Sequence, residues 1–245
     1  MVDFMTGTPR GIQDIPLEVR NKTMTRCWME MGVALALTAL IAWVAATSGA
    51  YLRFVSTLGF GGVFVLLIVI VVLGMVISSK TANNTMRPQT ARVLFYVYAV
   101  LMGFSLSTVF IMYDIKTIGV AFGVCSMYFF VLAMYGMLTK KDLSRLGPIL
   151  FVGLTVLIIA EVIVYFIFTS PGTIMLVNAL SILLFSIMTA MDTQQAQSIM
   201  LQAYPRGQDA VEKASINCAL SLYLDFLNLF LSILEILGQL NSDSD

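Results

Sequence analysis

Long stretches without a single charged residue limit what this chain can fold into more than any other feature. Residues 54–79, 93–113 and 117–139 contain no Asp, Glu, Lys or Arg. Each stretch is at least as long as the roughly 20 residues that an α-helix needs to cross the hydrocarbon core of a bilayer. Apolar residues make up 59% of the chain and charged residues 11%, against about 45–50% and about 25% in soluble domains. The sequence therefore predicts an integral membrane protein.

Seven membrane-spanning helices are predicted. Between Arg145 and Asp192 only Glu161 is charged, and Ser170-Pro171-Gly172 should divide that region into two helices. The predicted spans are 29–48, 56–79, 93–113, 117–138, 146–169, 173–192 and 215–238. The predicted fold class is thus all-α, with a transmembrane domain at 29–238, an N-terminal segment at 1–28 and a short tail at 239–245. Residues 1–28 have no apolar core, so no cleavable signal peptide is expected.

The basic residues predict an orientation in the bilayer. Of the 14 Lys and Arg residues, all but Arg53 and Lys116 fall in the N-terminal segment or in alternate connections on the same side. The positive-inside rule places that side, with the N-terminus, in the cytoplasm and the C-terminus outside. Short tails and compact connections, of which 193–214 is the longest predicted, suit a bacterial cytoplasmic membrane. The lipid bilayer is the expected surrounding.

Several classes of function are disfavoured by what the sequence lacks. There is no histidine, which excludes Ser-His and Cys-His catalysis, histidine metal sites and histidine pH switches. Three scattered cysteines, Cys27, Cys125 and Cys218, predict neither a disulfide framework nor a metal cluster. No phosphate-binding loop or dinucleotide motif is found, and the net charge is zero. No enzymatic activity, cofactor or nucleic-acid partner is predicted.

A polar stripe runs along the last span and contains a carboxylate, Asp225, in its middle. Its members recur at steps of three or four residues, so they share one face of an α-helix: Asn217, Ser221, Asp225, Asn228, Ser232 and Glu235. A charge at bilayer depth costs roughly 2.5–3.5 kcal/mol on insertion scales, so Asp225 should face protein or water. The polar seam, as these six residues are called below, is a candidate ion pathway. The uncharged members, in a simpler interpretation, only hydrogen-bond to neighbouring helices.

Asp192 is the second carboxylate of interest, at the predicted cytoplasmic end of the sixth span. A bend or a water-filled vestibule would let it meet Asp225, although alone it would be an ordinary interfacial acid. Two adjacent carboxylates share a proton and form a pH sensor. When ionised they are hard ligands suited to transient calcium binding. Glu161, in the middle of the fifth span, would add an oxygen ligand or pair with a basic residue. Gly119 and Gly123 form a GxxxG pattern that predicts tight helix packing within the protein.

Three segments resemble the transmembrane Bax inhibitor motif family. Residues 220–230 (LSLYLDFLNLF) resemble the family's closing signature, residues 135–144 (YGMLTKKDLS) its segment between the fourth and fifth helices, and residues 189–194 (TAMDTQ) the end of its sixth helix. They occur in the family's order, and the resemblance runs from about residue 25 to the C-terminus. It implies a seven-helix fold in which the C-terminal helix is central and wrapped by the other six.

The same resemblance implies a function, a pH-sensitive calcium leak channel with calcium as the permeant ion. The residues that match the family's sensor pair are Asp192 and Asp225. A shared proton favours the closed state, and its loss loosens the cytoplasmic end of the central helix. The family also places an arginine latch near the end of the second helix, where Lys80 and Arg87 are the candidates. An acidic residue that a bacterial relative carries within the second helix is missing here.

Three other functions remain open from the sequence. The first is a regulatory interaction protein that binds a membrane protease or another membrane protein, or modulates stress or cell-death pathways. It would use residues 1–28 and 193–214 and would tolerate loss of both aspartates. The second is an intramembrane aspartyl hydrolase, although neither Asp192 nor Asp225 lies in a Gly-x-Gly-Asp motif. The third is a transporter, for which no inverted repeat is visible.

Overall fold

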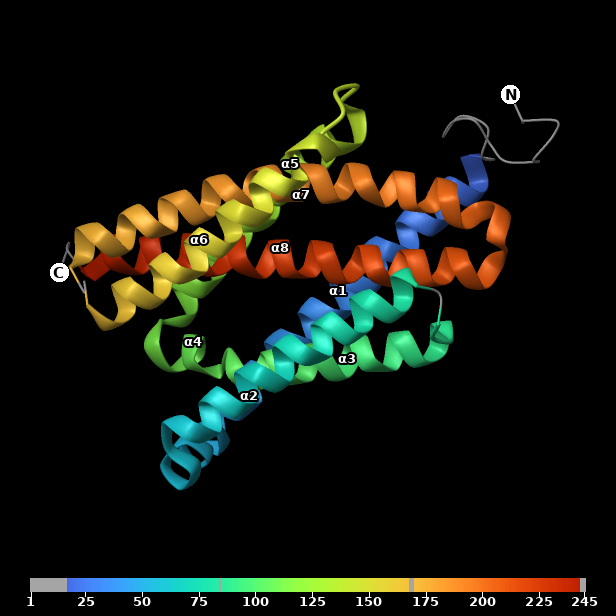
Figure 1. The fold of residues 1–245 in the computed structure, drawn as a ribbon. Helices are drawn as coiled ribbons and strands as arrows, with labels where there is room; N and C mark the ends of the chain where they lie inside the picture. The colour runs from blue at the N-terminus through green and yellow to red at the C-terminus, as the bar shows by residue number, and fades with distance from the viewer. Residues whose placement is uncertain (1–16, 84, 168–169, 243–245) are drawn as a thin grey trace. The chain divides into compact units, whose positions relative to one another are not determined.

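Every regular element is helical in the part of the chain that the computed structural model describes, residues 17–83, 85–167 and 170–242 (Figure 1). The predicted all-α class is confirmed. Seven segments are long and apolar enough to cross a membrane, as predicted, and α3 and α4 together make the third. The elements are α1 (Leu17–Thr47), α2 (Ala50–Ala82), α3 (Pro88–Ser105), α4 (Ser107–Met112), α5 (Ile115–Leu138), η2 (Ser144–Leu146), α6 (Gly147–Phe166), α7 (Pro171–Ala203), η3 (Tyr204–Arg206) and α8 (Gln208–Ser242).

Local chemistry sets several helix ends. Gly49 adopts φ 67°, a left-handed conformation that suits glycine, between the end of α1 and the start of α2. Inside α2, Gly59 (φ 62°) interrupts the helical backbone and produces a kink. Pro88 and Pro171 open α3 and α7, where a missing N–H costs no helical hydrogen bond. The side chain of Asp114 caps α5 by accepting from the backbone N–H of Lys116 at 2.7 Å.

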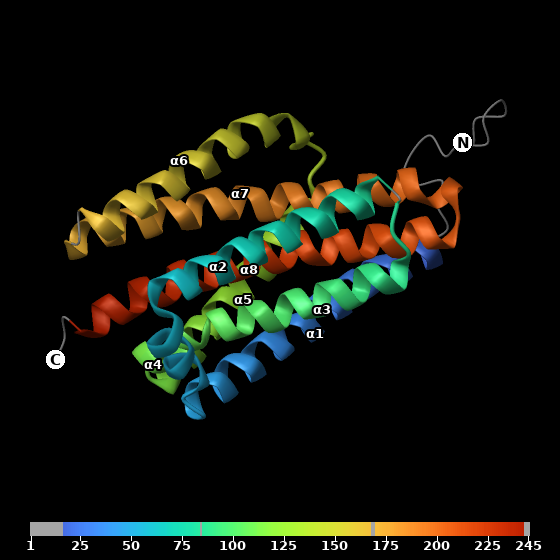
Figure 2. The ribbon, with the colours of Figure 1, turned by 60° about the horizontal axis from the view of Figure 1, so that its bottom comes forward.

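The helices form two compact units. Unit 1 contains residues up to Met112 together with Ala196–Tyr223, and unit 2 contains Tyr113–Gln195 and the chain from Leu224 onward. In unit 1, α1 packs against α2, α3 and α4 (Figure 2). The Tyr223 ring of α8 packs edge-on against Phe95 and Tyr98 of α3, and its hydroxyl lies 2.7 Å from the Thr38 hydroxyl of α1.

In unit 2, the second half of α8 contacts α5 and α7. The rings of Phe122 and Phe129 on α5 pack edge-on against Phe226, with centroids 5.6 and 5.4 Å away. Helices α5 and α7 approach closely at Gly136 of α5, where an added Cβ would overlap the Ala190 carbonyl of α7.

The predicted close packing at Gly119 and Gly123 is wrong. Both glycines are exposed, and an added Cβ would meet no atom within 4 Å. A GxxxG spacing places two glycines on one helix face, but whether another helix covers that face is decided by the tertiary fold.

The C-terminal helix is the most buried of the seven spans, as predicted for a central helix. Of its span 56% is buried, against 11–39% for the other six. The residues of α8 up to Tyr223 belong to unit 1 and those from Leu224 onward to unit 2. A helix that carries a polar seam must cover it with protein, because lipid offers no hydrogen-bonding partner.

The predicted connection at 193–214 is wrong, because most of it is helical. Helix α7 has 33 residues and α8 has 35, which is about 50 Å at ~1.5 Å per residue, longer than a ~30 Å hydrocarbon core. The two helices lie side by side (Figures 1 and 2). Small side chains allow close packing near the turn, in a cluster of Ala203, Ala210 and Ala214 with Ile199 and Val211. Residues 193–214 are too polar to resemble a membrane span, so the hydrophobic pattern does not predict that they are helical.

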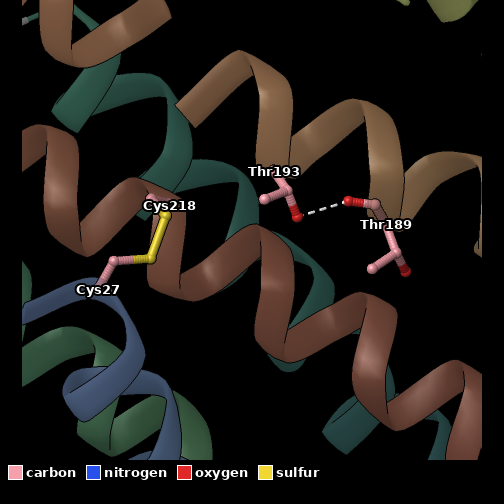
Figure 3. Close-up of a disulfide and its surroundings, with 4 residues drawn as sticks. All are labelled: Cys27, Thr189, Thr193 and Cys218. Carbon is pink, nitrogen blue, oxygen red and sulfur yellow. Dashed lines mark hydrogen bonds between the residues drawn. A yellow bond between two sulfur atoms is a disulfide. The ribbon is translucent and has the colours of Figure 1, made fainter. Parts of the chain in front are cut away.

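One further prediction needs correction. Cys27 of α1 and Cys218 of α8 form a disulfide within unit 1 (Figure 3), although the scattered cysteines had suggested none. Their separation of 191 residues is bridged by tertiary packing, which sequence spacing does not reveal. The N-terminal segment predicted at 1–28 overlaps α1, which begins at Leu17, and its boundary stays a prediction. Its first 16 residues lie outside the described part.

Candidate functional site

Asp225 lies in the middle of α8 with 2% of its surface exposed. Its Oδ2 atom is buried and has no hydrogen-bond partner among the residues that the structure describes. Asp192 is half-buried on α7, and its carboxylate is close enough to that of Asp225 for an electrostatic interaction. The structure thus brings together, within unit 2, the two carboxylates singled out from the sequence. Each raises the cost of ionising the other.

The threonine hydroxyl groups near Asp192 donate their hydrogen bonds within α7 itself. Thr193 Oγ1 donates to the Thr189 carbonyl at 2.7 Å (Figure 3), and Thr189 Oγ1 donates to the Phe185 carbonyl at 2.7 Å. Both threonines are fully buried. Because each hydroxyl has one proton, neither can donate to a carboxylate in this arrangement. The two threonines therefore do not satisfy the acid pair.

Two of the segments that resemble the Bax inhibitor family contact each other around Asp192. The side chain of Gln194 accepts from the Leu143 backbone N–H at 2.8 Å and donates to the Lys141 carbonyl at 2.7 Å. Gly136 packs against the backbone of Ala190. The 135–144 segment therefore holds the turn of α7 that carries Asp192, as a positioning element for this carboxylate.

The remaining polar seam makes mostly structural hydrogen bonds. Ser232 donates to the Ser181 hydroxyl of α7 at 3.0 Å, and both serines are buried. Asn228 donates to the Leu224 carbonyl of its own helix at 2.8 Å. In unit 1, Asn217 accepts from Thr81 of α2 at 3.2 Å, while Ser221 is half-buried. Asn217 and Ser232 thus fit the simpler interpretation of the seam, in which its uncharged members only hydrogen-bond to neighbouring helices.

A second acidic pair lies at the other end of unit 2. Glu235 of α8 is half-buried and Glu161 of α6 is exposed, and the two carboxylates interact electrostatically. Burial, and then the nearby Glu235 carboxylate, raises the pKa of the Tyr113 phenol. Among the described residues, no three His, Cys, Asp or Glu side chains converge to hold a metal ion.

Lys80 and Arg87, the two candidates for a latch, are exposed in unit 1. Lys80 lies in the last turn of α2, and Arg87 is the residue before α3. Neither forms a salt bridge with any residue that the structure describes. Their role as a latch stays a prediction.

Sequence reasoning missed a charged network in unit 1. Arg26 of α1 pairs with Glu212 of α8 at 2.9 Å, and Arg92 of α3 pairs with Glu30 of α1 at 2.5 Å. Tyr96 donates a hydrogen bond to the same Glu30. The signal was available, because Glu30 falls just inside the first predicted span, where an acid needs a partner.

Comparison with known proteins agrees with this architecture. The sequence model of the family described as "Inhibitor of apoptosis-promoting Bax1" matches residues 20–242. The chain is 35% identical over 211 residues to the inner membrane protein YbhL of Escherichia coli K12, and the aligned region covers 86% of this chain and 88% of YbhL. It is 34% identical over 219 residues to an uncharacterized protein of Rickettsia prowazekii, covering 89% of each chain. An uncharacterized protein of Borreliella burgdorferi is 30% identical over 229 residues, or 92% of this chain and 95% of that protein.

The family match spans nearly the whole chain, and YbhL is named as an inner membrane protein. Together with seven apolar helices of membrane-crossing length, these similarities identify the chain as an integral, multi-pass membrane protein that belongs to the Bax inhibitor-like family.

Proposed function

We propose that this protein is a pH-sensitive calcium leak channel of a bacterial cytoplasmic membrane, gated by Asp192 and Asp225. The N-terminus would lie in the cytoplasm and the C-terminus outside. One observation carries the proposal: Asp225 is buried in a membrane-spanning helix, with an oxygen that lacks a partner, and interacts with a second carboxylate. Neither carboxylate forms a salt bridge with a described residue, so a proton or a metal cation is the natural counter-charge.

The closed state holds one proton between the two carboxylates. Loss of that proton leaves two negative charges in a poorly hydrated site. Unit charges about 4 Å apart repel by about 4 kcal/mol at an effective dielectric of ~20. A single hydrogen bond between membrane helices, such as Ser232 to Ser181, contributes only about 0.6 kcal/mol. Repulsion therefore exceeds the local polar contacts and favours separation of α7 from α8, or entry of a cation.

The cation route follows the polar seam of α8. Oxygens of Asp225, Asn228, Ser232 and Glu235 recur along one face of the helix. The Glu161–Glu235 pair provides negative potential at the end proposed to be external, which raises the local concentration of cations. Ionised carboxylates and neutral oxygens are the ligands that calcium prefers.

Calcium uptake into proteoliposomes tests the proposal. Uptake is measured at about one pH unit below and one above neutral, because two coupled carboxylates titrate at different pH values from single carboxylates. Wild type should show a pH-dependent flux, and Asp225→Asn and Asp192→Asn should abolish the pH dependence, because an amide cannot titrate. The matched control is Asp114→Asn, which keeps a good N-cap residue. Asp114 is exposed before α5, and hydrogen bonds from Thr117 and Lys116 lower the pKa of its carboxyl. It stays ionised throughout the tested range, so its substitution should leave the response unchanged.

Two results would overturn the proposal. A normal pH response in Asp225→Asn would show that the sensor lies elsewhere. Folded wild type that gives no flux above empty liposomes at either pH would instead favour the regulatory interaction protein.

A further inference from the structure

A cavity of about 200 Å³ lies in unit 1, where the end of α2 meets the α7–α8 hairpin. Its walls are partly alanine, which leaves room because the side chains are short. Its polar lining is rich in hydrogen-bond donors and contains no carboxylate: Thr81, Gln202, Arg206, Lys213 and Asn217. The cavity holds space for several waters at about 30 Å³ each, which is enough for one tetrahedral oxyanion.

Lys213 is the unusual member of this lining. Only 6% of its surface is exposed, and it forms no hydrogen bond or salt bridge with a described residue. The nearest acid in sequence, Glu212, already pairs with Arg26 at 2.9 Å and with Arg92 at 4.0 Å. No described carboxylate pairs with this ammonium group, and its nitrogen is not fully enclosed, so it is open to an anion that enters the cavity. The described lining therefore carries positive charge and no negative charge.

Two further groups complete the donor set. Thr81 Oγ1 lies 2.7 Å from the Ile77 carbonyl and 3.2 Å from Asn217 Oδ1, so its single proton is shared between these acceptors. The Asn217 amide N–H groups bond to no described residue and can donate to a ligand. Arg206 is exposed beside the turn of the hairpin, and a planar guanidinium binds the oxygens of phosphate in pairs. One buried and one exposed cation thus line one small, donor-rich cavity.

We infer that this cavity binds a phosphate group, either the headgroup of an anionic phospholipid or a soluble phosphate. Two positive charges match the charge of a phosphate better than that of a single carboxylate. Basic pockets between helices near a membrane surface are sites where lipid headgroups bind. This site does not depend on calcium conduction or on the Asp192–Asp225 pair.

Binding is tested on full-length protein purified in a neutral detergent. One arm titrates inorganic phosphate against chloride at constant ionic strength and follows the thermal unfolding midpoint, which rises when a ligand binds the folded state. The other arm adds phosphatidylglycerol or an uncharged diacylglycerol and counts retained lipids by native mass spectrometry. Lys213→Met keeps the length of the side chain and removes its charge. Arg206→Gln removes the exposed charge and keeps the test valid if Lys213→Met folds poorly.

Wild type should bind at least one of the two phosphate sources, and each variant should weaken binding about tenfold or more, the loss expected for one charge-assisted hydrogen bond. Lys140→Met, an exposed lysine of unit 2, is the matched control and should bind like wild type. Stronger binding of phosphatidylglycerol identifies a lipid site, and response to inorganic phosphate alone identifies a soluble ligand. Equal binding by wild type and both variants, or binding of neither source by wild type, would overturn the inference. Calcium flux in proteoliposomes is scored separately, so the failure of one proposal leaves the other standing.

Discussion

A glycine pair on α5 offers a direct test of the packing that positions Asp192. At Gly136 an added methyl group would overlap the carbonyl of Ala190, two residues before Asp192 on α7. At Gly119, on the same helix, the same methyl group would meet no atom within 4 Å. The variants Gly136→Ala and Gly119→Ala therefore differ in tertiary contact while making the same chemical change in the same helix.

The magnitude follows from two opposing effects. Alanine gains up to about 1 kcal/mol over glycine in helix propensity, and this gain is common to both variants. Overpacking at a tight contact costs about 1–3 kcal/mol, and it applies only at Gly136, where the obstacle is backbone. The free energy of unfolding of Gly136→Ala should thus lie about 1–3 kcal/mol below that of Gly119→Ala, because the overpacking term remains when the common gain cancels.

Thermal unfolding in detergent measures this difference, since 1 kcal/mol corresponds to about 2–4 °C for a chain of this size. Gly119→Ala should unfold at or slightly above the wild-type temperature, and Gly136→Ala several degrees below Gly119→Ala. Equal unfolding temperatures for the two variants would refute the close approach of α5 and α7. In that case the 135–144 segment would not position Asp192.

Three other perturbations test separate parts of the structure. Cys27→Ser should abolish the mobility difference between reducing and non-reducing gels, and an unchanged mobility pattern would exclude the disulfide. The variant should also unfold at a lower temperature, because a crosslink across 191 residues contributes up to about 5 kcal/mol by loop entropy. Leu229→Asp places a charge at a fully buried position of α8 and should prevent folding; wild-type yield would show that α8 is not enclosed. Hydrogen bonds from Thr117 and Lys116 lower the pKa of Asp114 below 3.8. The ionised Asp114 cap therefore stabilises the protein above that pH, and this stabilisation is lost as the pH falls through the folded-state pKa. Asp114→Ala should thus lower the unfolding temperature at neutral pH, and the difference from wild type should shrink in acid.

The sequence by itself determined the fold class, the number of spans and which helix must be shielded from lipid. Charge-free stretches of more than 20 residues leave few alternatives to membrane helices, because a bilayer requires every backbone group to be satisfied within the helix. The same physics marked Asp225, since a carboxylate in the middle of an apolar helix must face protein or water. Its half-buried neighbour Asp192 was found from its place at the end of a span and from the family resemblance.

Tertiary structure alone decided which residues meet. Cys27 and Cys218 are 191 residues apart, Gly136 rather than Gly119 is covered by another helix, and Lys213 lines a cavity whose described lining contains no carboxylate. Helical periodicity tells which residues share one face of a helix, but it carries no information about which helix covers that face. In a membrane that choice rests on close packing between helices, because the hydrophobic effect that hides apolar faces in water is absent there.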